Sequence, residues 1–326
     1  MTVDIERDQY GRPQLPHPVT KKRQPWTRTT TMASTIQDRF ALEQWSKRNL
    51  VKGFVANEDL LVRAAAAGDN RNDLDQVIRA ADEAARASAA ADKGTAVHAL
   101  TEKVDRGEDV TIPRDYQADI DAYTTALRAA GINMLPEFIE TMTINVDLGC
   151  AGTPDRIVTC PQSDKPVIFD LKTGRNAIRY GMVEIAAQLA IYAHSTHWWD
   201  GHMHELPDLE KRFGIVLHMP AGTGQATLHS VDLKKGRDIA LLCHRVRQAR
   251  KTPELAKPLH QPFTDAEVRR RVDLIKDALQ GGPLPMRWPD GVNPPSRQPT
   301  PYDANQAALI GTWCVFVEDQ LELAPF

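Results

Sequence analysis

The sequence lacks the patterns that would place it in a membrane, in a secretory pathway or among small zinc-binding proteins. No apolar run approaches the roughly 20 residues that a membrane-spanning helix needs, and the start MTVDIERDQY contains no apolar signal core. The four cysteines, Cys150, Cys160, Cys243 and Cys314, form no C-x-x-C pair, which argues against a zinc ribbon or a contiguous iron–sulfur motif. We therefore expect reduced thiols, no membrane partner and a cytoplasmic location.

Common nucleotide-binding and hydrolase motifs are also missing. The chain has no G-x-G-x-x-G after a strand, no G-x-x-x-x-G-K-[ST] and no G-x-S-x-G, so dinucleotide, P-loop and nucleophile-elbow sites have no support. An excess of positive charge is absent too, because 40 Lys and Arg stand against 43 Asp and Glu, for a net charge of −3. If the protein binds nucleic acid, it must do so through a local basic groove rather than a globally basic surface.

Composition divides the 326 residues into four parts. Prolines beside a short basic run predict an extended basic arm over 1–28. The main domain is expected over 29–280, and seven prolines between 283 and 301 predict an extended strap over 281–303. The last part, 304–326, contains the apolar stretch LIGTWCVFV and is expected to pack back on the core.

Hydrophobic periodicity predicts helices first, then strands, then helices again. Helices are expected over about 31–67, 72–107, 115–130, 182–199, 235–251 and 264–280. Strands are expected over 137–147, 150–160 and 167–172, followed by a hairpin with arms at 212–220 and 225–233. This order predicts an α/β (α+β) fold in which helices flank one small mixed β-sheet, with helical additions toward both ends of the chain.

The most informative stretch, GTPDRIVTCPQSDKPVIFDLKTG, places two carboxylates and a lysine on neighbouring strands. Residues two apart on a strand share a face, so Asp170 and Lys172 point together while Phe169 and Leu171 point the other way. If the two strands pair, Asp155 reaches the same side. Converging carboxylates repel one another unless a cation lies between them or one of them is protonated. Oxygen ligands of this kind suit Mg²⁺ or Mn²⁺. A lysine beside them would balance charge or activate a water.

Two helical pairs flank this stretch. His98 and Glu102 are four residues apart and share a helix face, as do Gln188 and Tyr192. An imidazole ligand would shift the metal preference from Mg²⁺ toward Mn²⁺. Glu102, one turn beyond His98, would support that ligand or hold a second metal ion. Either pair alone carries little information, because amphipathic helices contain such pairs by chance.

Four short motifs occur in order along the chain. They are G-T-x-x-H at 94–98, G-T-P-D at 152–155, D-L-K-T-G at 170–174 and Q-x-x-x-Y at 188–192. In this series the chain resembles the RecB-like branch of the PD-(D/E)XK nuclease superfamily, and within it the stand-alone phage and CRISPR-associated exonucleases. The resemblance covers residues 94–192, and it implies a restriction-endonuclease-like catalytic core for this part.

The resemblance implies a metal centre built from the matching residues. His98, Asp155, Asp170 and the backbone carbonyl of Leu171 would ligate the metal ion. Lys172 would orient or deprotonate the attacking water. The metal would lower the pKa of that water and neutralise charge on the phosphate and on the leaving oxygen. The expected cofactor is therefore Mg²⁺ or Mn²⁺.

The resemblance also implies contacts with DNA. Gln188 and Tyr192 would touch the DNA backbone near the cleaved phosphate and brace Lys172. Further DNA contacts are expected from residues that flank the catalytic strands, namely Arg156, Thr173, Arg175 and Arg179. CRISPR-associated members often hold an iron–sulfur cluster on four cysteines, but the cysteine spacing here departs from theirs, so we expect no cluster.

The implied activity is hydrolysis of phosphodiester bonds from DNA ends by a Mg²⁺- or Mn²⁺-dependent exonuclease, with 5′→3′ polarity, in phage-type recombination, repair or replication. The expected partners are double- or single-stranded DNA ends and a single-strand annealing or recombination protein, and oligomerisation is left open. If a phage encodes the chain, its location would be the host cytoplasm. Two alternatives stay open: a structure-specific endonuclease of the same superfamily, and a non-catalytic DNA-binding recombination partner.

Overall fold

The chain divides into two compact units. The computed structural model describes residues 4–85, 89–253, 255, 263–284, 287–290, 292–294 and 300–321. The first unit is Met1–Lys251 and the second is Thr252–Phe326. This boundary lies well before the end of the predicted main domain, and part of the predicted strap lies outside the described residues.

The first unit is α+β, and its described residues form two mixed five-stranded sheets rather than one small sheet. Sheet A has the order β12–β11–β8–β7–β4, with β12 at Thr227–Asp232, β11 at Phe213–His218, β8 at Ser163–Lys172, β7 at Arg156–Cys160 and β4 at Asn133–Met134. Sheet B has the order β10–β9–β5–β6–β3, with β10 at Met203–Glu205, β9 at His197–Trp199, β5 at Met142–Asn145, β6 at Cys150–Gly152 and β3 at Thr27–Arg28. Both sheets are mixed because β11 runs parallel to β8 and β3 parallel to β6.

The predicted strand over 150–160 is split between the two sheets. β6 ends at Gly152 and β7 begins at Arg156. Between them Pro154 has no N–H for a ladder, and the chain bends at Asp155. The strand predicted over 137–147 likewise shortens to β5. β7 and β8 form the expected antiparallel pair.

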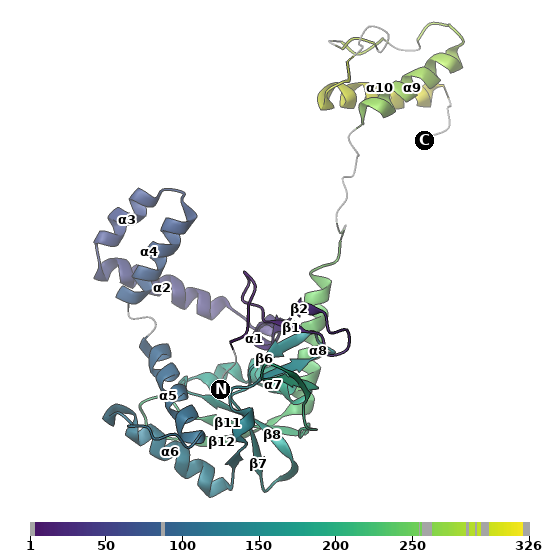
Figure 1. Cartoon of the computed structure of the whole chain (residues 1–326). Coiled ribbons are helices and arrows are strands. Elements are labelled where there is room, and N and C mark those ends of the chain that lie inside the picture. Colours follow the sequence, from purple (N-terminus) through teal and green to yellow (C-terminus); the bar gives the residue numbers. More distant parts are fainter. Residues whose placement is uncertain are drawn as a thin grey trace. The chain divides into compact units, whose positions relative to one another are not determined.

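Helices cover both faces of sheet A (Figure 1). α5 (Ala89–Asp105) and α6 (Arg114–Ala130) pack on the face that carries Phe169. α7 (Ala177–Ala193) packs on the face that carries Ile168. The strand end that carries the D-L-K-T-G motif therefore lies between helices from both sides of the sheet.

Some helices end where the sequence predicts and others do not. Gly131 adopts a φ of +65° just after α6, which closes the helix where the sequence predicts. The helix predicted over 182–199 ends early, since Trp198 and Trp199 belong to β9, which pairs with β5. The predicted hairpin is present as β11 and β12. It leads into α8 (Leu233–Ala249), which lies alongside α7.

The N-terminal arm, from residue 4 onward, is docked rather than free. β1 (Gln14–Pro16) pairs with β2 (Arg23–Pro25), and β3 joins the edge of sheet B. Leu15 and Trp26 are each 1% exposed and pack against residues of β5 and β6. The sequence predicts an extended basic arm here and does not reveal this packing, because two apolar residues spaced among prolines show no periodic pattern. Proline here restricts the chain without preventing it from contributing to a core.

Among the described residues, four α-helices lie between β3 and α5. They are α1 (Thr29–Ala33), α2 (Phe40–Ala56), α3 (Asp59–Ala67) and α4 (Arg71–Ala84). The last three pack together around Leu60, Val77 and Ala81. Gly53 lets α2 approach the backbone of Ala81 closely, because any side chain there would collide with it. These helices are the predicted helical addition toward the N-terminus.

The described part of the second unit is a pair of packed helices. α9 (Asp265–Leu279) and α10 (Ala304–Gln320) enclose a small apolar core that includes Trp313. Trp313 Nε1 donates to the carbonyl of Arg287 at 2.9 Å, so described residues of the predicted strap pack here. The segment over 304–326 is predicted to pack on the core of the main domain, but its described part packs on α9 within the second unit. Its last five residues lie outside the described part.

All four cysteines are unpaired and buried. Along the described stretches of the chain, no helix combines the length and the apolar character needed to cross a bilayer.

Candidate active site

The bend before β7 and the end of β8 bring two of the predicted carboxylates together. Asp155 lies in that bend, not inside a strand, and its Oδ2 accepts a hydrogen bond from the N–H of Leu171 at 2.7 Å. Arg156 lies opposite Phe169 in the antiparallel register. Asp155 therefore reaches the position next to Asp170 through a side-chain bond, and not through strand pairing alone.

Asp170 and Lys172 form an ion pair, with Oδ2 and Nζ 2.6 Å apart. As strand alternation predicts, Phe169 and Leu171 pack in the core on the opposite face of β8. Asp170 is only 2% exposed, and its Oδ2 accepts no hydrogen bond of good geometry in addition to this ion pair. A buried carboxylate oxygen in this state retains the capacity to bind a further cation.

The electrostatics of the pair follow from burial and from the second carboxylate. Burial, with the neighbouring charge of Asp155, raises the pKa of Asp170 to about 6. Burial alone would disfavour the Lys172 ammonium, but the carboxylates of Asp170 and Asp155 raise its pKa above the ordinary value. In this arrangement Lys172 is charged near neutral pH. It can stabilise a developing anion, whereas taking a proton from water requires that a cation first neutralise its carboxylate partners.

Helix α5 brings His98 to the carboxylates. Its Nδ1 lies 3.7 Å from Asp155 Oδ2, and burial lowers the pKa of the imidazole. The ring is therefore neutral near pH 7, which is the form that binds metals. The helix comes this close because Gly94 has no side chain: a Cβ there would lie 2.6 Å from Thr173 Oγ1. The glycine of G-T-x-x-H and the threonine of D-L-K-T-G thus pack against each other.

The Q-x-x-x-Y pair braces the loop between β6 and β7. Tyr192 is 2% exposed, and its hydroxyl donates to the carbonyl of Thr153 at 3.1 Å. The Gln188 side chain is close enough to affect the pKa of this hydroxyl. A Cβ on Gly152 would lie 3.1 Å from the Tyr192 hydroxyl, so this glycine keeps the loop close to α7. Because the hydroxyl is buried and bonded, it holds the Asp155 bend and does not extend toward a DNA backbone.

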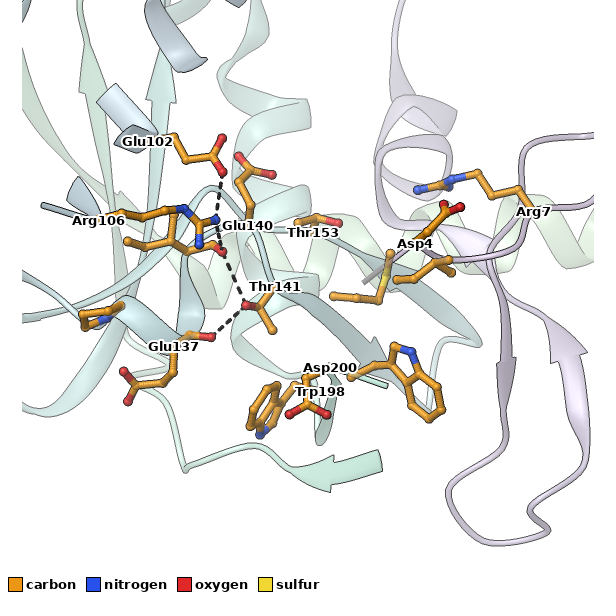
Figure 2. A pocket seen from close by; sticks show the side chains of 15 residues that line it. Asp4, Arg7, Glu102, Arg106, Glu137, Glu140, Thr141, Thr153, Trp198 and Asp200 are labelled. Atoms are coloured by element: carbon orange, nitrogen blue, oxygen red, sulfur yellow. Dashed lines mark hydrogen bonds and ion pairs between the residues drawn. The ribbon is translucent and has the colours of Figure 1, made fainter. Parts of the chain in front are cut away.

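Glu102 is engaged by an arginine one turn further along α5. Arg106 donates to Glu102 Oε1 at 2.8 Å and to the carbonyl of Ile139 at 3.2 Å. Figure 2 shows this pair in the wall of a cavity. Glu102 is close enough to His98 to act on its charge, but its direct partner here is Arg106. A role for Glu102 beside a metal ion would require exchange of this ion pair.

Two acidic residues near the site were missed from the sequence. Glu140 has a φ of +52°, its N–H donates to the carbonyl of Asp155 at 3.0 Å, and burial together with the Asp155 charge raises its pKa to about 8. Burial also raises the pKa of Glu184, which lies near Lys172. Glu184 is one turn before Gln188, a spacing that could have revealed it. No local signal reveals Glu140, because its position depends on a backbone turn.

The expectation that Arg156 contacts DNA is wrong. Its side chain is fully buried, and Nε donates to Asp105 Oδ2 at 2.7 Å while Nη2 donates to Thr101 Oγ1 at 3.1 Å. The Tyr123 hydroxyl donates to the same Asp105 oxygen at 2.8 Å. The network ties α5 and α6 to β7, so Arg156 has a structural role.

The other three predicted DNA contacts follow β8. Arg175 and Arg179 are exposed, and the Arg179 guanidinium lies over the Tyr180 ring at 5.1 Å. Thr173 is half-buried, and its carbonyl accepts the N–H of Ala221 at 3.1 Å. The two arginines can therefore meet a phosphate, while Thr173 joins the end of β8 to the β11–β12 loop.

The donor set is of the kind that a hard divalent cation takes. Two carboxylates, a neutral imidazole and a strand carbonyl suit Mg²⁺ or Mn²⁺, and the buried Asp170 Oδ2 has no hydrogen bond of good geometry beyond its ion pair with Lys172. As arranged here, no three His, Cys, Asp or Glu side chains within the described ranges cluster closely enough to hold a metal ion. Asp155 is instead bonded to the Leu171 N–H, and Asp170 to Lys172. Metal binding would replace these two contacts.

Neither a protein-family model nor a curated protein matches this chain. Support for a function therefore comes from the chain's own residues and their geometry.

Proposed function

We propose that this protein is a metal-dependent DNA nuclease of the PD-(D/E)XK type. The convergence of Asp155, Asp170 and Lys172 beside a neutral His98 is the observation that carries the proposal. Mutually repelling, buried carboxylates cost stability unless a cation joins them. A protein that only binds DNA has no use for this costly set, whereas phosphodiester hydrolysis uses each member of it.

The chain's own groups divide the work of hydrolysis. Asp155, Asp170, His98 and the Leu171 carbonyl would hold the divalent cation, which when bound neutralises phosphate charge and lowers the pKa of a water. Lys172 would orient the attacking water and stabilise the charge that develops on the phosphate. A bound cation would neutralise the carboxylates and so lower the pKa of Lys172. The ammonium could then release its proton to solvent, and the neutral amine could accept the proton of the attacking water.

Residues around this set would hold the substrate and the loop in place. Tyr192 keeps the Thr153 carbonyl, and with it the Asp155 bend, against α7. Arg175 and Arg179 are exposed just after β8 and would contact phosphates next to the cleaved bond. Guanidinium groups suit this task because they bind phosphate oxygens in pairs.

We propose further that the enzyme is an exonuclease with 5′→3′ polarity. The test incubates the full-length protein and Mn²⁺ or Mg²⁺ with linear DNA, labelled at either end, and with a closed circle. An exonuclease releases nucleotides from linear DNA and leaves the circle intact, and early release of a 5′ label gives the polarity. Cleavage of the circle would favour the endonuclease alternative. Binding of DNA without metal-dependent cleavage of any substrate would overturn the nuclease proposal.

The proposed activity gives the protein a place in phage-type recombination, repair or replication, acting in the cytoplasm. An enzyme that resects DNA ends exposes a single strand, so a single-strand annealing or recombination protein is the natural partner.

A further inference from the structure

Two cavities lie next to the candidate active site. The larger, about 860 Å³, is lined by Glu102, Glu140, Trp198 and Trp199, among others (Figure 2). The smaller, about 360 Å³, is lined in part by Tyr192. The cavities adjoin, because they share three lining residues, namely Arg7, Met142 and Thr153.

The described lining of the two cavities includes none of His98, Asp155, Asp170 and Lys172, but it includes residues bonded next to them. Thr153 lies in both walls, and its carbonyl accepts the Tyr192 hydroxyl. In the larger cavity, Glu140 is bonded through its N–H to the carbonyl of Asp155. A DNA strand whose cleaved phosphate lies at Asp155 would therefore place its neighbouring nucleotides in these two cavities.

The two cavities differ in charge. The smaller is lined by Arg7 and Arg28, with Thr29 and Thr30 beside them, and none of its described lining residues is acidic. The larger contains two arginines and five acidic residues, Asp4, Glu102, Glu137, Glu140 and Asp200. Four of these are carboxylates near pH 7, since the raised pKa of Glu140, about 8, keeps it protonated. Phosphates are attracted to the first surface and repelled by the second. Carboxylates instead accept hydrogen bonds from the amino groups of nucleobases.

The larger cavity contains two tryptophans, of which Trp199 offers its indole ring for stacking and Trp198 is already packed. Trp198 is fixed in place, because its ring stacks on His204 with centroids 4.5 Å apart and meets Phe138 edge-on at 5.4 Å. Trp199 is half-buried against the core that contains Leu15 and keeps exposed surface. Every base has a flat face that can stack on such a ring, so stacking holds a strand without reading its sequence.

We propose that the two cavities form a track for one DNA strand beside the cleaved bond, with phosphates along Arg7 and Arg28 and unpaired bases against Trp199. This inference rests on the proposed nuclease function and adds the substrate class to it. The enzyme takes unpaired DNA at the point of cleavage, from a single strand or from a melted duplex end. A basic peptide, which the acidic lining also attracts, is the competing occupant.

The test measures binding and cleavage of a labelled single-stranded oligonucleotide by the full-length protein. A second oligonucleotide of the same length lacks bases at the positions next to the cleaved bond. Because it cannot stack, the oligonucleotide without these bases should bind at least about fivefold more weakly than the complete one. Trp199→Ala should lose most of this discrimination, and Trp199→Phe, which keeps a ring, should retain it. Circular dichroism checks that both variants are folded.

The phosphate side of the track has its own test. Arg28→Glu should weaken binding of both oligonucleotides alike and reduce the steepness of its salt dependence. Arg63→Glu, which changes an exposed arginine on α3 that lines neither cavity, is the matched control. Equal effects of the two substitutions would overturn the placement of the phosphates.

The outcomes separate this inference from the function on which it rests. Normal cleavage with no preference for the strand that carries bases would overturn the track and leave the nuclease proposal standing. Absence of cleavage on every substrate would overturn the nuclease proposal itself. A lysine-rich peptide that binds more tightly than DNA, and loses affinity with Trp199→Ala, would identify a peptide as the occupant and overturn the track.

Discussion

Gly94 on α5 packs directly against Thr173 at the end of β8, so closely that a Cβ at position 94 would lie 2.6 Å from Thr173 Oγ1. Gly94→Ala should push α5 away from the sheet, move His98 and lower nuclease activity at least about tenfold, since catalysis depends on placement. The same Cβ lies 3.6 Å from Thr173 Cβ, an ordinary contact. The double variant Gly94→Ala/Thr173→Ala should therefore recover much of the lost activity, and failure to recover it would show that the contact does not position His98.

Lys172 should be needed for hydrolysis but not for folding. Lys172→Ala should lower the cleavage rate at least about 100-fold, the usual loss when a group that stabilises transition-state charge is removed. Lys165→Ala is the matched control, because Lys165 is on the same strand and is paired with Asp208 in solvent. Rates on labelled DNA measure the effect, and unchanged cleavage by the Lys172 variant would remove this residue from the mechanism.

His98 should contribute to metal affinity. His98→Ala should weaken Mn²⁺ binding at least about tenfold, since even outer partners of a metal ligand contribute this much. Isothermal titration calorimetry measures the affinity directly and does not depend on activity. The control is His202→Ala, because the His202 side chain is 88% exposed. Equal Mn²⁺ affinity in the two variants would place His98 outside the metal site.

Glu140 should make stability depend on pH. Burial and the Asp155 charge raise its pKa to about 8 from an ordinary value of 4.5. Between these values the folded chain holds a proton that the unfolded chain releases, so stability falls as pH rises through the interval. Glu140→Gln has no carboxyl to titrate, so its free energy of unfolding does not fall in this way. The stability of the variant relative to the wild type should therefore rise with pH across the interval and stay constant above it. The gain should be on the order of a few kcal/mol at most.

Urea unfolding with EDTA present, repeated across and above that pH interval, measures the difference for Glu140→Gln. An advantage that stays constant with pH would show that the Glu140 carboxyl is not protonated in the folded chain.

Substitution of Arg156 should lower stability, whereas substitution of Arg175 should weaken DNA binding. Arg156→Met leaves the buried carboxylate of Asp105 without its partner and should cost about 3–5 kcal/mol of stability. Arg175 is exposed, so Arg175→Met should change stability by less than about 0.5 kcal/mol while weakening DNA binding. Chemical denaturation and fluorescence anisotropy give the two readouts. A stable Arg156 variant with impaired DNA binding would restore the sequence-based role for Arg156.

Local periodicity predicts the parts of the site that depend only on local geometry. The separation of Asp170 from Phe169 onto two faces of β8 follows from strand alternation. The end of α6 follows from the glycine at position 131. The α+β class follows from the order of helical and alternating segments. In each case the residues that form the feature are close together in the sequence.

Long-range contacts explain what the sequence does not predict. Arg156 follows the G-T-P-D motif and has the charge of a DNA contact, but its partner Asp105 comes from a distant helix. The division into two sheets depends on the break at Pro154 and on strands that pair far along the chain. Glu140 reaches the site through an unusual backbone angle, which no side-chain pattern announces.

The parallel pairing of β3 with β6 also has a consequence for how the chain folds. Thr27 pairs with Cys150, so the N-terminal strand has no edge to join until the ribosome has made most of the first unit. Contacts between residues this far apart form slowly, and nascent domains in this state expose apolar surface. Trp26 and Leu15 therefore lack the cover of Met142, Ile144 and Ala151 until those residues have been synthesised.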